Sequence, residues 1–350
     1  MAGARKRRAV MAIAAMLILN GCEKAGATGA VDNSPSQPAE KPATGEQGRK
    51  QTFAAWLDDL KAEARTTRGI RPDILEQAFA GVSPLPRVLE RDRTQPEMTL
   101  TFQDYLSRTV TAARVATGCK KMAAHRQILA EIDRAFGVPP RFIVALWGIE
   151  SDFGRLTGGF PVVGALATLA HEGRRSAYFR QELLDALTIL DQGHITAERM
   201  HGSWAGAMGQ NQFMPSSFLR FAKDHDGDGR RDIWNTEADV FASTANYLAT
   251  LGWKDDHGWG RAVRLPERFD STLAARKVKK TLSGWTALGV TGTDGRPLPN
   301  KSIAALLVLP DGNAAPAFLV YDNYGILLQW NRSNLFALVV GYLADRLQAR

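Results

Sequence analysis

The chain has 350 residues and a formal net charge of +8, with 45% hydrophobic and 23% charged residues. This composition is ordinary for a globular protein and excludes a collagen-like, coiled-coil or wholly disordered chain. Half of the positive excess comes from residues 5–8. The remaining half is too small an excess of positive charge to indicate specific nucleic-acid binding, which we do not expect. Two cysteines exclude both a disulfide framework and a Cys-rich zinc site.

The chain opens with a basic segment and a short apolar run. Residues 9–19 are uninterrupted apolar residues. A bilayer-spanning helix needs about 20 such residues, so this run is typical of a secretory signal peptide. It ends in Leu19-Asn20-Gly21-Cys22, which resembles the lipobox of bacterial lipoproteins. We therefore predict a lipoprotein signal peptide over residues 1–21 and lipidation of Cys22, the alternative being an ordinary signal peptide.

Composition changes sharply after the signal sequence. Residues 23–50 are rich in Gly, Ala, Pro, Ser, Thr, Glu and Lys and contain no aromatic residue. Such a segment cannot bury a core, so residues 22–52 are predicted to be a disordered, lipid-anchored linker. Residues 53–350 are then predicted to be the folded region.

Apolar residues recur at helical spacing from Phe53 onward, which predicts a helical region over residues 53–252. Within it, Pro139 and Pro140 precede the segment 142–149, which is apolar on all sides. Proline fits the first turn of a helix, because those N–H groups have no helical partner. We therefore expect a central, buried helix at this place.

The pattern changes again after Trp253. Short apolar segments bounded by Gly, Pro, Asn and Asp predict a small β subdomain over about residues 253–330, and these segments are 263–266, 304–309 and 318–321. Residues 323–325 are typical of a hairpin turn leading into a further strand at 326–328. A helix over residues 332–349 is expected to close the chain.

The segment from Trp147 to Gly154 contains a candidate catalytic acid. Glu150 lies at the end of the apolar helix. Burial there disfavours the charged carboxylate and raises its pKa, so Glu150 can donate a proton near neutral pH. The alternative is a helix-end Glu that points into solvent. Asp152, two residues away, falls on another helix face and is a weak candidate for a second catalytic carboxylate.

A second block, from Gly202 to Ser217, combines small residues with neutral polar groups. Ser203, Asn211 and Gln212 offer donors and acceptors suited to sugar hydroxyl or acetamido groups. The alternative is a tight turn that only packs helices. The chain has no phosphate loop and no GxGxxG, HExxH or GxSxG motif, and we expect no organic cofactor.

An aspartate-rich loop follows the spacing of an EF-hand calcium site. The ligands predicted at positions one, three, five and seven are Asp224, Asp226, Asp228 and the carbonyl oxygen of Arg230. Asn235 stands at position twelve, where a Glu is expected, so Asp239 is the nearest later candidate for the closing ligand. Calcium in a structural role is predicted, and the alternative is a solvated acidic turn with arginine counterions.

Together these blocks resemble the membrane-bound lytic transglycosylase B family of bacterial cell-wall enzymes, from about Thr101 to the C-terminus. The further matching blocks are Ala165 to Leu169, Arg174-Arg175 and Phe213 to Ser217. The resemblance implies a mainly α (α+β) fold: a lysozyme-like helical catalytic core, a helical flanking domain and a small β domain.

The resemblance also implies site residues. Glu150 falls on the catalytic Glu of the family and Ser203 on the Ser that orients it by a hydrogen bond. The substrate-contacting residues of the family fall on Gln212, Tyr247 and Asn331. Two family tyrosines fall on Trp330 and Phe336, which lack their hydroxyl groups and leave the roles of those positions open.

The implied activity is a peptidoglycan lytic transglycosylase, a lyase. It would cleave the β-1,4 bond between N-acetylmuramic acid and N-acetylglucosamine and leave a 1,6-anhydro end, with one Glu as acid and base. The implied partners are glycan strands, a membrane through Cys22 and other cell-wall enzymes. The implied location is the periplasmic side of the outer membrane. A lysozyme-type hydrolase and a non-catalytic peptidoglycan-binding lipoprotein remain the alternatives.

Overall fold

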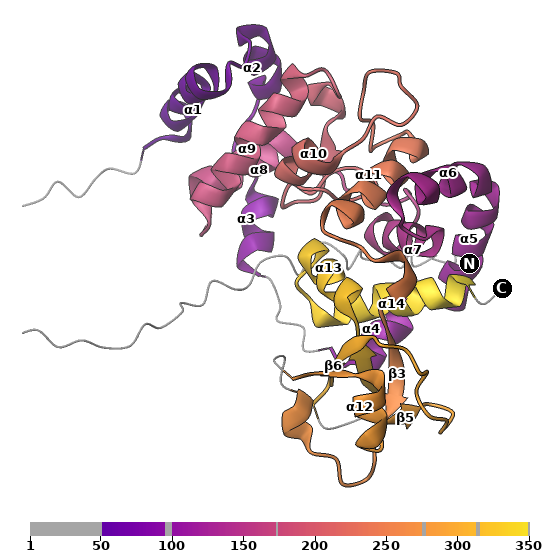
Figure 1. Cartoon of the computed structure of the whole chain (residues 1–350). Coiled ribbons are helices and arrows are strands. Elements are labelled where there is room, and N and C mark those ends of the chain that lie inside the picture. Colours follow the sequence, from indigo (N-terminus) through magenta and orange to yellow (C-terminus); the bar gives the residue numbers. More distant parts are fainter. Residues whose placement is uncertain (1–50, 95–99, 173, 275–277, 313–315, 349–350) are drawn as a thin grey trace, which may run out of the picture.

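A computed structural model of the chain describes residues 51–94, 100–172, 174–274, 278–312 and 316–348. Figure 1 shows helices at one end, a mixed helical body in the middle and a small sheet at the other end. The signal sequence, Cys22 and most of the linker lie outside the described residues, so they remain predictions.

The described residues are mainly helical. The helices are α1 (Phe53–Arg68), α2 (Pro72–Phe79), α3 (Pro86–Arg93), α4 (Phe102–Thr109), α5 (Ala112–Ala124), α6 (Arg126–Phe136), α7 (Pro140–Ser151), α8 (Val162–Glu172), α9 (Ser176–Asp191), α10 (Pro215–Phe221), α11 (Glu237–Thr250), α12 (Leu282–Ala287), α13 (Asp322–Trp330) and α14 (Asn334–Gln348). The strands are β1 (Phe160–Pro161), β2 (His201–Gly202), β3 (Gly260–Arg264), β4 (Lys279–Thr281), β5 (Thr291–Gly292), β6 (Ala304–Val308) and β7 (Ala317–Val320).

Helix α7 lies at the centre of the middle body. Every residue from Phe142 to Ser151 is buried, and the helix packs against α5, α6, α11 and α14. Pro140 occupies its first turn, as the sequence predicts. The prediction of a central, buried helix is confirmed, and Glu150 is carried on its last turn.

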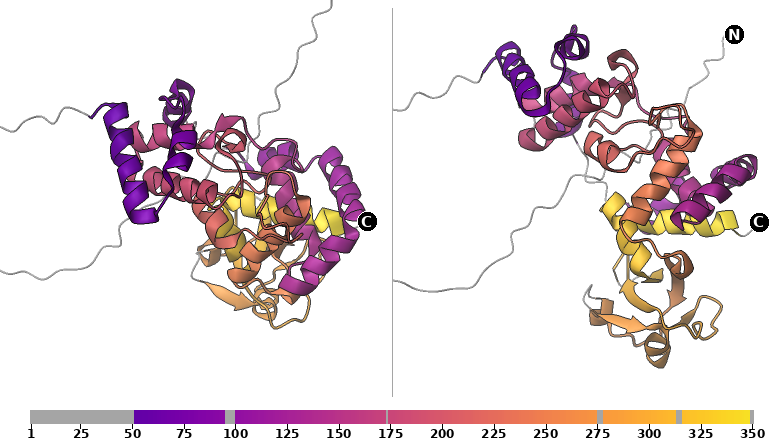
Figure 2. Two further views of the ribbon diagram at one scale, coloured as in Figure 1. Left: turned by 90° about the horizontal axis from the view of Figure 1, so that it is seen from above. Right: turned by 45° about the horizontal axis from the view of Figure 1, so that its top comes forward.

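The outer helical layer is built around the antiparallel pair α8 and α9. Helices α1 and α2 pack on this pair, α3 packs on α8 and α10 on α9. Figure 2 shows this layer beside the middle body rather than around it. A two-stranded sheet, β1 with β2, links α8 to the small-residue block and pairs Phe160 with Gly202.

The small sheet has five antiparallel strands in the order β4-β6-β7-β3-β5. The three segments predicted as strands fall on β3, β6 and β7. The subdomain has its own apolar core, which includes Leu282 and Trp285 of α12. Strands β4 and β5 are too short and too polar for the sequence pattern to reveal.

The predicted hairpin at residues 323–328 is wrong, because this segment lies in helix α13. Asn323, Tyr324 and Leu327 share the spacing of one helix face and are buried, whereas Gly325 is exposed. A short apolar run cannot distinguish a strand from a helix by periodicity. Contact with α14 gives the helix a surface to pack on.

Within the described ranges, none of the helices is long and apolar enough to cross a membrane.

Candidate active site

Glu150 lies on the last turn of α7 with only 6% of its surface exposed. Burial raises the pKa of Glu150 to about 8, while a hydrogen bond from Trp330 acts in the opposite direction. The carboxyl group is therefore largely protonated at neutral pH. This agrees with the expected environment of a proton donor and contradicts a solvent-facing Glu.

The turn after Glu150 has an unusual backbone. Asp152 and Phe153 both adopt left-handed conformations, with φ of 52° and 59°. Such conformations in residues other than glycine are costly and persist where the surrounding structure enforces them. Phe153 is held under the helix, because a Cβ atom at Gly148 would lie 2.7 Å from its ring. The close approach explains why a glycine precedes the catalytic turn.

Asp152 does not share the surroundings of Glu150. It caps the helix and forms ion pairs with Arg155 and, at 3.7 Å, with Arg114. Its carboxylate thus pairs with two guanidinium groups.

The hydrogen bond to Glu150 comes from Trp330, the last residue of α13. The indole Nε1–H of Trp330 donates to Oε1 of Glu150 at 2.7 Å. The sequence left the role of Trp330 open, because the position lacks the tyrosine hydroxyl of the family. The indole N–H supplies a donor that the sequence pattern does not reveal, since nothing along the chain shows that α13 reaches the end of α7.

Ser203 does not make its predicted hydrogen bond to Glu150. Its hydroxyl oxygen accepts a hydrogen bond from the backbone N–H of Ala207 at 3.0 Å, and Ser203 N–H donates to the Ala207 carbonyl at 2.7 Å. The side chain therefore closes its own tight turn. Among the described residues, Trp330 provides the contact that was expected of Ser203.

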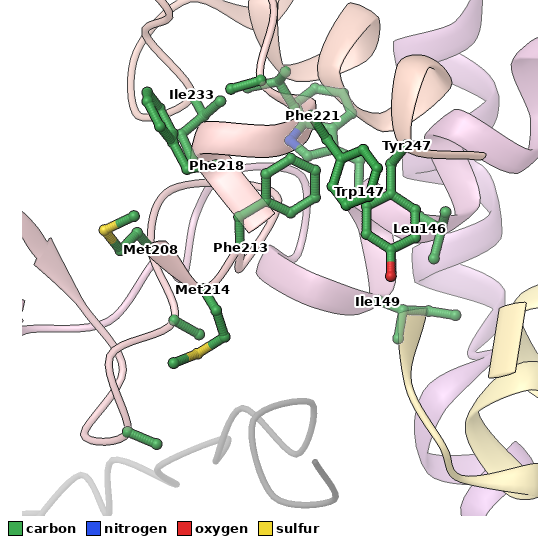
Figure 3. Packing of buried hydrophobic residues seen from close by; sticks show 14 of the residues in the cluster. Leu146, Trp147, Ile149, Met208, Phe213, Met214, Phe218, Phe221, Ile233 and Tyr247 are labelled. Atoms are coloured by element: carbon green, nitrogen blue, oxygen red, sulfur yellow. The ribbon is translucent and has the colours of Figure 1, made fainter. Parts of the chain in front are cut away.

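Tyr247 of α11 lies beside Trp330. The two rings meet edge to face with centroids 4.7 Å apart, and the Tyr247 hydroxyl donates to the Gln329 carbonyl at 2.9 Å. Phe213 also packs against both rings. Figure 3 shows Phe213 and Phe221 beside Tyr247, with Ile149 of α7 below it in this view. These rings form an apolar wall around the indole that contacts the buried Glu150.

Gln212 lies in a left-handed turn, with φ of 51°. Its Nε2 group donates to the carbonyl oxygens of Thr157 at 3.0 Å and Gly209 at 2.8 Å. The amide is therefore fixed, and it is partly exposed. Both properties suit a substrate-contacting side chain.

Asn211 has a structural role instead of the sugar-binding role considered for it. It is buried, and its Nδ2 group donates to the Val240 carbonyl and to the Thr244 hydroxyl on α11. Its neighbour Gln210 is buried too and accepts from the indole N–H of Trp147 at 2.7 Å. Of these neighbouring polar residues, Gln210 and Asn211 are thus buried, whereas Gln212 is partly exposed.

Asn331 and Phe336 follow Trp330 at the junction of α13 and α14. Asn331 is buried, and its Oδ1 accepts from the backbone N–H of Ser333 at 3.0 Å. Phe336 is buried within α14 as part of the core. The loss of its hydroxyl therefore suits an apolar position.

Tyr105 of α4 interacts electrostatically with Glu150, although the sequence patterns did not single it out. It is buried, and its pKa is raised by burial and by the charge of Glu150, with Arg114 acting in the opposite direction. This places the phenol in the electrostatic field of Glu150. Tyr105 lies three residues after Phe102, and this helical spacing indicates only a second aromatic residue in the core.

The structure brings together part of the predicted calcium site. Carboxylate oxygens of Asp224, Asp226 and Asp239 all lie within 4.8 Å of one another. Asp239 is buried at the start of α11, and its two oxygens accept backbone N–H groups of His225 and Asp232. A set of carboxylate oxygens fits calcium, which prefers oxygen ligands.

The position-twelve residue turns away from this cluster. Asn235 donates through its Nδ2 group to the Asp232 carboxylate. Asp239 joins the cluster instead, as the departure from the EF-hand pattern predicted. Asp228 accepts from the N–H of Arg230 at 2.8 Å, and both residues remain predicted ligands.

Comparisons with known proteins agree with this arrangement. The family described as the transglycosylase SLT domain matches residues 52–345. The membrane-bound lytic murein transglycosylase B of Escherichia coli (strain K12) is 33% identical over 247 residues, which are 69% of this chain and 66% of that protein. The alignment thus spans slightly less than two thirds of that relative.

Solved structures of similar proteins share the fold. SltB3 from Pseudomonas aeruginosa, in complex with NAG-anhNAM-pentapeptide, is 44% identical, with a TM-score of 0.83 over 85% of this chain and 80% of that one. SltB1 from the same organism is 27% identical, with a TM-score of 0.74 over 83% and 98%. Escherichia coli Slt35, in complex with calcium, is 27% identical, with a TM-score of 0.70 over 83% and 92%.

These similarities confirm the predicted mainly α, lysozyme-like fold with a small sheet. The family match also covers the outer helices, the middle body and the sheet. This chain belongs to the transglycosylase SLT domain family.

Proposed function

We propose that this protein is a peptidoglycan lytic transglycosylase. It cleaves the β-1,4 bond between N-acetylmuramic acid and N-acetylglucosamine and leaves a 1,6-anhydro-N-acetylmuramic acid end. The observation that carries the proposal is the buried Glu150, whose pKa is raised to about 8 at the end of α7. A carboxylic acid that is protonated at neutral pH can donate its proton to a glycosidic oxygen.

One carboxyl group acts in both steps of this reaction. Glu150 first protonates the glycosidic oxygen as its bond to C1 breaks. The resulting carboxylate then takes the proton of the C6 hydroxyl as that oxygen bonds to C1, so no water is consumed. The N-acetyl group of the substrate stabilises positive charge at C1, as in substrate-assisted hydrolases.

The surroundings of Glu150 support a single catalytic carboxylate. Hydrolases of the two-carboxylate type place a second acid about 5–9.5 Å from the first. Among the described residues, no other carboxylate contributes to the pKa of Glu150, which burial raises and the hydrogen bond from Trp330 lowers. The nearby Asp152 is paired with arginines.

The remaining site residues position the glycan in this proposal. The Gln212 amide is fixed through its Nε2 group, so its Oε1 oxygen can accept from a substrate N–H or hydroxyl. Tyr247 packs edge to face on Trp330, Asn331 follows Trp330 in the chain, and Ser203 closes the turn with Ala207. SltB3, a relative, has been seen with NAG-NAM-pentapeptide, which supports peptidoglycan strands as the substrate.

Mass analysis of fragments released from purified sacculi tests this function. We expect anhydro-muropeptides, each lighter by one water than the hydrolytic product. Fragments with reducing ends would instead establish a lysozyme-type hydrolase with a second acid. Binding to sacculi without any fragments would establish a non-catalytic tethering protein.

The same proposal includes a lipid anchor at Cys22 and a location on the periplasmic side of the outer membrane. The sequence Leu19 to Cys22 and the membrane-bound relative in Escherichia coli support it. Cys22→Ala should release the protein from washed membranes, because the anchor is lost. Cys119→Ala, at the partly buried free cysteine of α5, is the matched control. Retention of the Cys22→Ala protein in membranes would contradict the anchor.

We also propose that calcium binds the loop between α10 and α11 in a structural role. Asp224, Asp226 and Asp239 would hold it, joined by Asp228 and the Arg230 carbonyl. When bound, the ion supplies positive charge that offsets the repulsion between these carboxylates. The Slt35 relative has been solved in complex with calcium.

A further inference from the structure

The hydrogen bond to Glu150 has a chemical direction. An indole N–H can donate a hydrogen bond but offers no acceptor, unlike a hydroxyl group. Trp330 Nε1 lies 2.7 Å from Oε1 of Glu150. When Glu150 is protonated, the proton is therefore favoured on Oε2, so that the better acceptor, the carbonyl-type oxygen, faces the indole.

The indole is held firmly in this direction. The Trp330 ring packs edge to face on Tyr247 at 4.7 Å and against Phe213 at 5.3 Å. The backbone on which it stands is fixed by the hydrogen bond from the Tyr247 hydroxyl to the Gln329 carbonyl. A rotation of the indole away from Glu150 would break these aromatic contacts, so the donor stays aimed at Oε1.

Other titratable groups near Glu150 come from different elements. Burial and the charge of Glu150 both raise the pKa of Tyr105 of α4. The Tyr105 phenol therefore stays neutral over the pH range in which Glu150 titrates. Arg114 of α5 acts on that phenol and pairs with Asp152, which also pairs with Arg155. The indole is thus the group that touches the carboxyl group directly.

We propose that Trp330 is the positioning residue of the catalytic acid, which holds Oε1 in both protonation states and leaves Oε2 to give and take the transferred proton. The inference rests on the proposed transglycosylase function and adds the identity of the reacting oxygen. In the first step Oε2 gives its proton to the glycosidic oxygen. In the second step the same oxygen accepts the proton of the C6 hydroxyl, while Oε1 remains bonded to the indole.

The indole also adjusts how readily Glu150 alternates between these roles. A hydrogen bond to a carboxylate favours the charged form and lowers the pKa against the effect of burial. Without it, the acid would hold its proton more tightly. The first step would still have a protonated acid, but the carboxylate needed in the second step would be less stable.

The test compares pH–rate profiles for anhydro-product release from sacculi by the full-length protein. Trp330→Phe removes the N–H and keeps an aromatic ring. A hydrogen bond to a charged group has the magnitude of about one pKa unit or more. We therefore expect a rate loss of about tenfold or more and an alkaline midpoint that moves upward by about one pH unit. Trp330→Tyr, which restores a donor, should recover much of the rate.

Trp285→Phe is the matched control. Trp285 is also buried and also donates its Nε1–H, to the Ala305 carbonyl within the small sheet. A merely structural role of Trp330 predicts that both Phe variants lose stability and keep the wild-type midpoint. An unshifted midpoint in active Trp330→Phe would therefore overturn the proposal. Absence of anhydro products from the wild type would instead overturn the proposed function.

A second measurement does not depend on the folding of Trp330→Phe. In protein labelled with ¹⁵N-tryptophan, the Trp330 indole N–H resonance should shift with pH at the midpoint of Glu150, near 8. The shift should vanish in Glu150→Gln, and Trp330→Tyr assigns the resonance by removing it. If every indole resonance were indifferent to pH between 6 and 10, the proposal would be wrong.

Discussion

The carboxyl group of Glu150 at the end of α7 and that of Asp224 in the loop before α11 have opposite surroundings. Glu150 is buried among apolar side chains and receives one hydrogen bond, from an indole. Asp224 is more exposed and accepts the backbone N–H groups of Gly227 and Gly229 at 2.7 and 2.9 Å. The site of Glu150 is therefore dry and poor in donors, whereas the site of Asp224 is wetter and rich in donors, with Asp239 as its buried member.

The difference shows how the environment of a carboxyl group suits it either to proton donation or to ion binding. Burial raises the pKa of Glu150 to about 8, which makes it a proton donor. At Asp224, desolvation opposes ionisation, but the hydrogen bonds outweigh it and hold the pKa below its usual value. A carboxylate that stays charged beside Asp226 and Asp239 is suited to a cation. Proton donation and ion binding therefore need opposite environments.

The largest effect on activity is expected when Glu150, the acid of the dry site, is replaced by a residue that cannot transfer a proton. Glu150→Gln keeps the shape, and its amide oxygen can still accept from Trp330, but it cannot transfer a proton. General acid–base catalysis contributes about 10²–10⁴-fold, and here one group acts twice. We expect near-complete loss of sacculus lysis, measured as muropeptide release, with retained folding and glycan binding. Full anhydro-product formation by this variant would refute the assignment of Glu150.

The same substitution should change stability in a pH-dependent way. Between the ordinary pKa of 4.5 and the raised value of about 8, the unfolded chain ionises Glu150 while the folded protein keeps it protonated. This group therefore lowers the free energy of unfolding progressively as the pH rises through that window. Denaturation should find Glu150→Gln more stable than wild type at pH 8, by up to several kcal/mol, and nearly equal at pH 4. A constant difference would contradict the raised pKa.

Removal of calcium probes the wet site. An ion that binds only the native state, and is present at a concentration of 100 times its Kd, stabilises that state by about 2.7 kcal/mol. Chelation should lower the melting temperature, and calcium should restore it better than magnesium, which demands a smaller octahedral shell. Asp239→Asn should abolish this response. Asp294→Asn, in an exposed turn of the small subdomain, is the control that should keep it. Indifference of metal-free protein to calcium would favour a solvated acidic turn.

The smallest effect is expected at the wall of the dry site. Tyr247→Phe removes the hydrogen bond to the Gln329 carbonyl and keeps the ring against Trp330. One hydrogen bond contributes about 0.5–1.5 kcal/mol, so thermal unfolding should show a small loss. The pH midpoint of Glu150 should stay near 8, because the apolar ring remains. A large fall in that midpoint would show that the hydroxyl keeps water out.

Sequence patterns were sufficient where a feature depends on neighbours along the chain. The apolar run after Pro139 and Pro140 predicted α7 and its burial, and the segments on β3, β6 and β7 were correctly predicted as strands. The aspartate pattern predicted the approach of Asp224, Asp226 and Asp239, whereas Asp228 and Arg230 remain predicted ligands. In each case local periodicity or loop spacing carries the information.

Contacts between distant segments escaped the sequence patterns. The helix at 322–330 was mistaken for a hairpin, since nine residues with a glycine among them fit either structure. Ser203 was expected to hold the catalytic acid, yet it closes its own turn with Ala207. The contact is made by Trp330, which is 180 residues from Glu150 along the chain.

The buried helix, its terminal acid and the acidic loop can be predicted from the amino-acid sequence, because each depends on residues close together in the chain. The donor that meets this acid, and the burial of the acid, depend on how distant segments pack together. The apolar wall and the indole come from α11, α13 and the block after Gly202. A pKa depends on everything packed around the group, so it is fixed only when these distant segments meet.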